Sequence, residues 1–235
     1  MRNIAILLAS GSGSRVGGDI PKQFLKVGDK YVFEYSLRTF NDYIGIDEVV
    51  LVARADYMEL VRSVVRDGKY NKVVRVVPGG ETRQESVSNG IFTIGHDEGN
   101  VLIHDTARPF VTKGMIERVL GALESCSAVS TVLPATDTMF KVDEVDRVED
   151  VPDRTFLRRV QTPQGFYLST IKKAHYMAIK EDLTLATDDC SLIRHFGLGD
   201  IYTVKGDDLA FKITTPLDLV FAQSIADNLT VLDSD

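Results

Sequence analysis

The sequence predicts an α/β protein built on a mostly parallel, doubly wound sheet, and three observations support this prediction. Short apolar runs rich in β-branched residues alternate with segments of helical periodicity. The runs are continuously apolar, as expected for strands buried on both faces. A composition of 44% hydrophobic and 26% charged residues is that of a globular chain, and 235 residues suit one domain with an insertion.

The elements follow one another without a repeat, a linker or a low-complexity tract, so we expect a single domain over residues 1–235. Apolar residues at three- and four-residue spacing predict helices at 33–40, 57–65, 84–94 and 113–123. The continuous apolar runs predict strands at 4–9, 48–53, 73–77, 100–104 and 128–134. Beyond residue 159 the rhythm resumes with helices at 169–179, 188–195 and 216–228 and a strand at 201–204.

Residues 137–159 break this rhythm, because short apolar pieces there alternate with charges, as in residues 139–148. That alternation predicts a two-sided hairpin and not a buried parallel strand. Two interpretations of the hairpin stay open. It is either a solvated surface feature or a projecting arm that pairs with another subunit, since a lone hairpin is only marginally stable in water.

Charge and cysteine content argue against several classes of protein. Lys and Arg number 27 against 34 Asp and Glu, and the formal net charge of −7 argues against a nucleic-acid backbone as the main partner. The apolar run near Met1 is too short to span a membrane and lacks a signal-peptide cleavage pattern, so we expect no membrane association. Two cysteines, Cys126 and Cys190, suit a reducing cytoplasm and provide neither a disulfide scaffold nor a four-ligand zinc site.

A glycine-rich segment with two cations follows the first predicted strand. Gly11 and Gly13 allow the backbone to approach a phosphate closely, while Arg15 lies inside the loop and Lys22 just after it. The spacing is neither that of a P-loop nor that of the dinucleotide fingerprint. Glycine-rich turns are common in α/β folds whatever they bind, but glycines combined with two cations predict a polyphosphate site.

Asp105 directly follows the predicted strand at 100–104. Ligands of open α/β sheets bind outside the carboxyl ends of strands, which puts Asp105 near the glycine-rich segment. Its carboxylate can hold Mg²⁺ or accept hydrogen bonds from sugar hydroxyls, and Arg108 can clamp a phosphate or brace Asp105. The simpler alternative is that Asp105 caps the following helix. We interpret His104 as structural, because the sequence offers no aligned nucleophile for it.

Three further segments carry residues suited to the same site. Residues 79–86 contain two glycines for close approach, with Thr82 expected to cap a helix. Lys212 ends a short strand-like run, where its ammonium can reach a phosphate. Three cations lie ahead of Thr162: Arg154, Arg158 and Arg159. Cations from separate segments, one Asp and no activated nucleophile predict phosphoryl or nucleotidyl transfer by positioning and charge neutralisation.

Across nearly the whole chain these motifs resemble the cytidylyltransferases that activate polyol phosphates, above all the methylerythritol phosphate enzymes of non-mevalonate isoprenoid biosynthesis. The resemblance implies a Rossmann-like sheet, CTP and a small polyol phosphate as substrates, and Mg²⁺ as cofactor. It also implies a homodimer formed through an extended β-arm, here residues 137–159. The matching segments are residues 8–15, 21–25, 79–87, 104–110, 137–138, 153–154, 161–164, 187–189 and 212–219.

Carried over position by position, the resemblance implies a role for each matching residue. The CTP phosphates would be held by Arg15, Lys22 and Lys212, while Asp105 would bind sugar hydroxyls and lie near the metal. The cytosine and ribose would be bound by Ala9, Ser10, Gly11, Gly13, Gly80, Glu81 and Ser86. The acceptor would be held, besides Asp105, by Arg108, Thr138, Arg154, Thr162 and Thr187, with Arg154 reaching across the dimer.

Ser10 and Arg158 depart from the pattern most common among the isoprenoid enzymes, which leaves a second acceptor open. The alternative group resembles the ribitol-5-phosphate cytidylyltransferases of teichoic acid and capsule assembly and shares the CTP site. Ala107 before Arg108 and the segment 80–87 favour the isoprenoid group. A non-catalytic nucleotide-binding regulator is disfavoured by the presence of all three phosphate cations, and a nicotinamide dehydrogenase by the glycine spacing.

Overall fold

One seven-stranded mixed sheet organises the chain, whose computed structural model describes residues 1–11, 20–184 and 188–232. Its strands are β1 (Asn3–Ala9), β4 (Glu48–Ala53), β5 (Val73–Pro78), β6 (Asn100–Asp105), β7 (Ala128–Pro134), β10 (Arg158–Tyr167) and β11 (Tyr202–Lys205). The spatial order is β11-β7-β10-β6-β1-β4-β5. Neighbouring strands are parallel except that β10 runs antiparallel to both β6 and β7. A separate small hairpin pairs β2 (Lys26–Val27) with β3 (Lys30–Tyr31).

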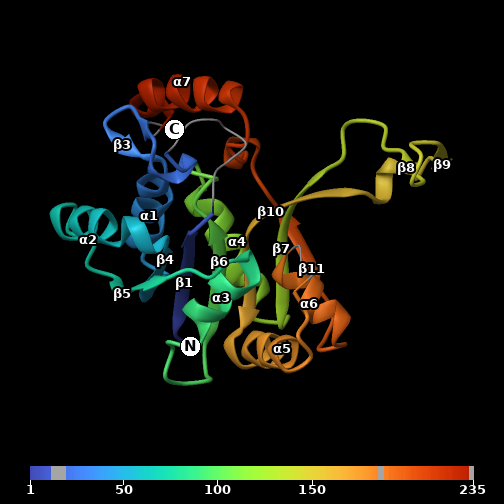
Figure 1. The fold of residues 1–235 in the computed structure, drawn as a ribbon, viewed down its shortest axis with the longest axis horizontal. Coiled ribbons are helices and arrows are strands. Elements are labelled where there is room, and N and C mark those ends of the chain that lie inside the picture. The colour runs from blue at the N-terminus through green and yellow to red at the C-terminus, as the bar shows by residue number, and fades with distance from the viewer. Residues whose placement is uncertain (12–19, 185–187, 233–235) are drawn as a thin grey trace.

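Helices cover both faces of this sheet (Figure 1). They are α1 (Val32–Asp42), α2 (Met58–Asp67), α3 (Arg83–Ile91), α4 (Lys113–Ala122), α5 (Leu168–Lys180), α6 (Asp189–His195) and α7 (Pro216–Leu232). α1, α2 and α4 contribute to one hydrophobic cluster against the sheet, and α3, α5 and α6 to another. α7 lies at the top of the view and closes a third, smaller cluster. Four short 3₁₀ helices are η1 (Lys22–Phe24), η2 (Ala55–Tyr57), η3 (Arg154–Phe156) and η4 (Asp208–Ala210).

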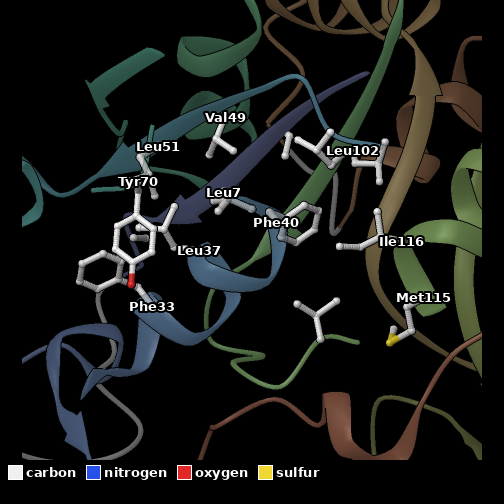
Figure 2. Close-up of a cluster of buried hydrophobic side chains, with 14 of the residues drawn as sticks. Leu7, Phe33, Leu37, Phe40, Val49, Leu51, Tyr70, Leu102, Met115 and Ile116 are labelled. Carbon is white, nitrogen blue, oxygen red and sulfur yellow. The ribbon is translucent and has the colours of Figure 1, made fainter. Parts of the chain in front are cut away.

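The core between α1 and the sheet shows why the apolar spacing of residues 33–40 produces a helix at this place. Phe33, Leu37 and Phe40 recur at four- and three-residue intervals, so they share one face of α1. Figure 2 shows these side chains beside Leu7 and Leu102 of the strands, and all five are completely buried. Burying one such side chain stabilises a fold by about 1.5–3 kcal/mol, so this layer holds α1 against the sheet.

Between β7 and β10 the chain leaves the sheet as an arm, residues 135–157, which extends to the right in Figure 1. β8 (Lys141–Val142) and β9 (Val148–Asp150) pair antiparallel within it, so the predicted hairpin is confirmed. Apolar side chains on the arm remain exposed, by 59% at Phe140 and 84% at Phe156. Several exposed apolar side chains on one projecting segment are typical of an interaction site.

The predicted class, a mostly parallel sheet with helices on both faces, is confirmed, but the burial expected for one strand is wrong. β5 is an edge strand and is only partly buried, with Val74 exposed by 46%. Its apolar run resembles that of a central strand because its inner neighbour β4 and the helices still cover part of it. In the described part of the chain, no helix is long and apolar enough to cross a membrane.

β10 is the strand of the seven-stranded sheet that the sequence did not predict. Its centre, residues 161–164, is polar and contains a proline, which argues against a central strand. The structure accommodates it through a register shift against β7, and the buried amides find partners in neighbouring loops. Gln161 Nε2 donates to the carbonyl oxygen of Asp207 at 2.8 Å, and Gln164 Nε2 donates to Asp188 Oδ2 at 2.6 Å. Tertiary hydrogen bonds therefore override the local preference.

Candidate active site

A cavity of about 710 Å³ opens at the carboxyl ends of β1, β4, β5 and β6. Four strand-end segments line it: residues 10–11, 54–56, 79–83 and 105–107. Lys22, Gln23 and Lys212 join the lining from outside the sheet, together with Leu8 and Ser86. The volume lies in the range of small-molecule sites, and the position is the edge where ligands of open α/β sheets bind. The cavity therefore forms where the sequence placed the phosphate site.

Lys22 is fixed at this edge by η1 and is only 7% exposed. Its Nζ donates to the carbonyl oxygen of Ile213 at 2.5 Å, which ties η1 to the segment ahead of α7. The next residue holds the start of the glycine-rich segment, because Gln23 Nε2 donates to the carbonyl oxygens of Ala9 and Gly11 at 3.0 and 2.6 Å. A buried ammonium is thus held beside the turn that follows β1.

Asp105 lies between two cations. Lys212 Nζ is 2.7 Å from Oδ2, and Arg83 Nε is 3.1 Å from Oδ1. Burial alone would raise the pKa of Asp105, but the charges of Arg83 and Lys212 outweigh it and lower the pKa below its usual value. Asp105 is therefore ionised at neutral pH. The alternative that it caps the next helix is wrong, because α4 begins at Lys113 and Thr112 provides its cap.

Arg83 extends this contact into a buried polar chain that the sequence did not reveal. Its Nη1 lies 2.8 Å from Asp189 Oδ2, Asp189 Oδ1 lies 3.2 Å from His175 Nε2, and His175 Nδ1 lies 2.8 Å from Ser88 Oγ. Burial would raise the pKa of Asp189, but Arg83 and His175 lower it. Arg83 thereby joins α3, β6 and α6. Its signal in the sequence was a cation three residues after a glycine pair, which carried no assigned role.

The glycine pair after β5 closes onto the first turn of α3. Thr82 caps the helix as predicted, since its Oγ1 accepts from the backbone N–H of Glu85 at 3.1 Å. The N–H of Gly80 donates to Ser86 Oγ at 3.1 Å, and that of Glu81 to Glu85 Oε2 at 2.8 Å. A Cβ atom at Gly80 would lie 2.4 Å from the Cβ of Glu85, so only glycine fits this turn. The structure thus brings Gly80, Glu81 and Ser86 together at the β5 end of the cavity.

His104 is structural, as the sequence indicated. It is completely buried, and burial lowers its pKa from 6.5 to about 4, so the ring is neutral. Its Nε2 lies 3.0 Å from the carbonyl oxygen of Arg108, which can only accept, so Nδ1 accepts from the Thr162 hydroxyl at 3.0 Å. That hydroxyl in turn accepts from the backbone N–H of Asp105 at 3.1 Å. The ring therefore fixes Thr162 against the strand end.

A test of this arrangement is the pH dependence of stability. The pKa of His104 is about 4 in the folded protein, against 6.5 for a solvated histidine, so the unfolded chain binds a proton first as pH falls. Stability is therefore lost between pH 6.5 and pH 4, by about 3 kcal/mol at 1.36 kcal/mol per pKa unit. Urea unfolding without added metal should show this loss in the parent protein, and His104→Gln should flatten it. A parallel loss in both proteins would contradict the assignment.

Arg108 makes two backbone contacts that the sequence did not predict. Its Nη1 donates to the carbonyl oxygen of Ala210 at 2.9 Å and its Nη2 to that of Val160 at 3.2 Å. Its Nε has no hydrogen-bond partner among the described residues. Burial lowers the pKa of Arg108, although nearby Asp105 acts in the opposite direction. As placed here, Arg108 holds β10 to the segment ahead of α7.

The remaining predicted residues lie outside the cavity or outside the described part of the chain. Thr138 and Arg154 belong to the arm and are exposed, and neither lines the cavity of its own chain. Arg154 Nη1 donates to the carbonyl oxygen of Thr136 at 3.0 Å. Three predicted residues lie outside the described residues: Gly13, Arg15 and Thr187.

A divalent cation at this site would depend on Asp105. Among residues 1–11, 20–184 and 188–232, no group of three or more His, Cys, Asp or Glu is placed to hold a metal ion. Asp105 offers one carboxylate, and Mg²⁺ at nucleotide sites commonly uses only one or two carboxylates together with phosphate oxygens and water. One carboxylate is therefore enough for a Mg²⁺ that arrives with a triphosphate, and Asp105 would be its protein ligand.

Comparisons with known proteins agree with this geometry. The family model of 2-C-methyl-D-erythritol 4-phosphate cytidylyltransferase matches residues 3–228. A protein of that name from Corynebacterium efficiens is 40% identical over 232 residues, covering 95% of this chain and 93% of the relative. One from Thermotoga neapolitana is 40% identical over 225 residues, covering 95% and 96%.

Solved structures show the same fold. The 4-diphosphocytidyl-2C-methyl-D-erythritol synthase of Anaerococcus prevotii superimposes with a TM-score of 0.86 at 30% identity, covering 96% of both chains. The Thermus thermophilus 2-C-methyl-D-erythritol 4-phosphate cytidylyltransferase gives 0.75 at 33% identity, covering 94% of this chain and 98% of that one. The family match over nearly the whole length and the relatives at 40% identity lead to one conclusion: the chain belongs to the 2-C-methyl-D-erythritol 4-phosphate cytidylyltransferase family, a family of nucleotidyltransferases.

Proposed function

We propose that the protein joins CTP and 2-C-methyl-D-erythritol 4-phosphate, giving the CDP-linked polyol and pyrophosphate. The observation that carries the proposal is the ionised Asp105 between Lys212 and Arg83 beside the buried Lys22, at the strand-end cavity. The relatives named above all carry the methylerythritol phosphate activity in their names, which disfavours the ribitol 5-phosphate alternative.

The transfer needs no covalent enzyme intermediate. An oxygen of the acceptor phosphate is already a nucleophile at neutral pH, so it forms a bond to the α-phosphorus of CTP while the bond to the β-phosphate oxygen breaks. The electron pair of that bond leaves with pyrophosphate. Lys22 and Lys212 would stabilise the charge that develops on the α-phosphate and on the leaving group, together with Arg15, which is assigned from the sequence.

Nucleotide and acceptor would approach from different elements. Ala9, Ser10, Gly11 and Gly13, with Gly80, Glu81 and Ser86, would surround the base and ribose. Asp105 would bind a sugar hydroxyl and hold Mg²⁺, which when bound neutralises phosphate charge. The acceptor would be held by Thr162 beside Asp105, by Arg108 and Thr187, and by Thr138 and Arg154 of a second copy. The exposed apolar surface of the arm supports such a homodimer, and a cytoplasmic location stays a prediction from the cysteine content.

A direct assay tests the proposal. The purified protein is mixed with CTP and either methylerythritol 4-phosphate or ribitol 5-phosphate, and pyrophosphate release is followed. We expect kcat/KM for methylerythritol phosphate to exceed that for ribitol phosphate by at least ~10-fold, the scale of a small shape difference in a pocket. Faster reaction with ribitol phosphate would move the protein to the alternative acceptor, and no pyrophosphate from either would overturn the function.

Removing the Arg154 side chain separates acceptor binding from nucleotide binding. For Arg154→Ala we expect a raised KM for the acceptor with CTP affinity largely kept, because the proposed partner of Arg154 is the acceptor phosphate. Steady-state kinetics and CTP titration measure the two effects. Arg147→Ala is the matched control, since Arg147 is an exposed arm cation paired with Asp143 at 2.9 Å. Collapse of CTP affinity in Arg154→Ala would remove Arg154 from the acceptor site.

A further inference from the structure

A closed ring of contacts begins and ends at Asp105. Arg83 Nε lies 3.1 Å from Asp105 Oδ1, and Arg83 Nη1 lies 2.8 Å from Asp189 Oδ2. The backbone N–H of Asp189 donates to Gln164 Oε1 at 3.2 Å. Gln164 lies two residues after Thr162 in β10, and the Thr162 hydroxyl accepts from the backbone N–H of Asp105 at 3.1 Å. The ring therefore joins residues of α3, α6, β10 and β6.

The β10 side of this ring is buried and held by further hydrogen bonds. Gln164 is completely buried, Asp189 is 1% exposed and Thr162 is 6% exposed. Besides accepting from Asp189, the Gln164 amide donates to Ser130 Oγ at 3.2 Å and to Asp188 Oδ2 at 2.6 Å. Buried polar groups that are hydrogen-bonded in this way make their surroundings rigid. The Thr162 hydroxyl is thus attached to a fixed segment of β10.

Asp189 connects the two sides of the ring. Its backbone N–H holds Gln164, and its carboxylate holds Arg83. A guanidinium is planar and carries its donors in a rigid fork, so a contact that fixes Nη1 also fixes the direction in which Nε points toward Asp105. Arg83 and Asp105 line the cavity, whereas Asp189 does not. The orientation of the Asp105 carboxylate therefore depends on a carboxylate outside the cavity.

We propose that Asp189 is a positioning residue for the acceptor substrate, because it fixes the Asp105 carboxylate and the Thr162 hydroxyl relative to each other. An acceptor that contacts both groups needs them at one separation, and a displacement of about 1 Å can cost up to ~10²-fold in rate. The inference rests on the proposed function, in which Asp105 and Thr162 both bind the polyol phosphate.

The contacts that hold the nucleotide side of the cavity do not pass through Asp189. Gln23 Nε2 holds the start of the glycine-rich segment, and Lys22 Nζ donates to a carbonyl oxygen ahead of α7. A change at Asp189 removes neither contact. We therefore expect such a change to weaken acceptor binding while CTP binding is retained, a difference that a general loss of structure would not produce.

The test is Asp189→Asn, which keeps an oxygen facing Arg83 but removes the charge that holds the guanidinium. We expect KM for methylerythritol 4-phosphate to rise by about 10-fold or more, the scale of one hydrogen bond between charged groups. The Kd of CTP, measured by titration, should change by less than about 3-fold. Arg83→Lys keeps the cation but loses the fork, so it should raise the same KM. Because both substitutions open one ring, the double variant should be no worse than the weaker single variant.

Lys172→Met is the matched control for a loss of stability. Lys172 Nζ donates to the carbonyl oxygen of Ile94 at 2.8 Å and pairs with Asp97 at 2.7 Å, in the segment that leads into β6. This segment lies at the opposite end of β6 from Asp105. The control should lower the Tm and leave KM for the acceptor unchanged.

Three results would overturn the inference. The first is a KM for the acceptor within about 3-fold of the parent value in folded Asp189→Asn. The second is a Kd of CTP that rises as much as this KM, and the third is an equal rise of this KM in Lys172→Met. Should Asp189→Asn not fold, the same criteria apply to Arg83→Lys. Absence of pyrophosphate release in the parent protein would instead overturn the proposed function.

Discussion

Replacing Lys22 by alanine is expected to lower kcat by at least ~10²-fold, the scale of losing one preorganised electrostatic group. The ammonium is buried and held by the Ile213 carbonyl, so water cannot replace its charge without the surrounding contacts changing. From the sequence, the same loss is expected for Arg15→Ala. Initial rates of pyrophosphate release at saturating CTP and acceptor measure the effect.

Two further variants distinguish a loss of catalysis from a loss of folding. Lys22→Met keeps most of the aliphatic stem and should be as slow as the alanine variant, with a Tm close to that of the parent protein. Lys26→Ala removes an exposed lysine from β2 and should leave the rate unchanged. Near-normal rates in both Lys22→Ala and Arg15→Ala would contradict the assignment of these residues to triphosphate binding.

Replacing Arg83 by methionine is expected to lower the free energy of unfolding by about 3–5 kcal/mol at pH 7. The substitution leaves Asp105 and Asp189 buried without the cation between them, and removing one member of a buried ion pair carries a cost of this size. Urea unfolding at pH 7 measures the loss. The comparison variant is Arg62→Met, which breaks an exposed pair with Glu59 and should cost less than about 1 kcal/mol.

The pH dependence of this loss identifies its origin. The pKa values of Asp105 and Asp189 are lowered in the folded protein. The stability that these two carboxylates contribute is therefore present above the pKa of an ordinary aspartate and is lost as pH falls below it. Without Arg83 both carboxyls titrate at higher pH. The difference in the free energy of unfolding between the parent protein and Arg83→Met should therefore be largest at neutral pH and become smaller below about pH 4. A loss in Arg83→Met no larger than in Arg62→Met would show that the buried chain contributes little.

Periodicity predicted the parts of this fold that bury continuous apolar side chains. β1 and β4 are apolar at nearly every position and lie inside the sheet, so their place follows from composition alone. β10 could not be predicted in this way, because its polar centre is stabilised by Asp207 and Asp188, which lie far along the chain. The edge position of β5 has one sign in the sequence, because the exposed Arg75 interrupts its run of valines, but four valines around one charge also suit a buried strand.

The residues of the candidate site likewise fall into those that the sequence reveals and those that only the structure reveals. Asp105 stands out in the sequence as a charge at a strand end, Lys22 as a cation after the glycine-rich segment, and Lys212 as a cation in a strand-like run that the structure shows to be a loop. The structure brings the three to one cavity. Arg83 and its buried partner Asp189 did not stand out, because only the fold shows that Arg83 of α3 reaches Asp189 of α6 as well as Asp105 of β6. Spacing along a chain reveals charges beside one backbone turn, whereas contacts between separate helices require the packed structure.

The arm lies between two paired strands, so its length can vary with little effect on the stability of the sheet. Residues 135–157 form the loop that closes when β7 pairs with β10, and both strands remain in the sheet whatever the loop contains. For a flexible loop, each doubling of length adds only about 0.6 kcal/mol of closure entropy. Lengthening or shortening the arm should therefore change the folding equilibrium very little. The length and sequence of the arm can thus vary to match the surface that it contacts.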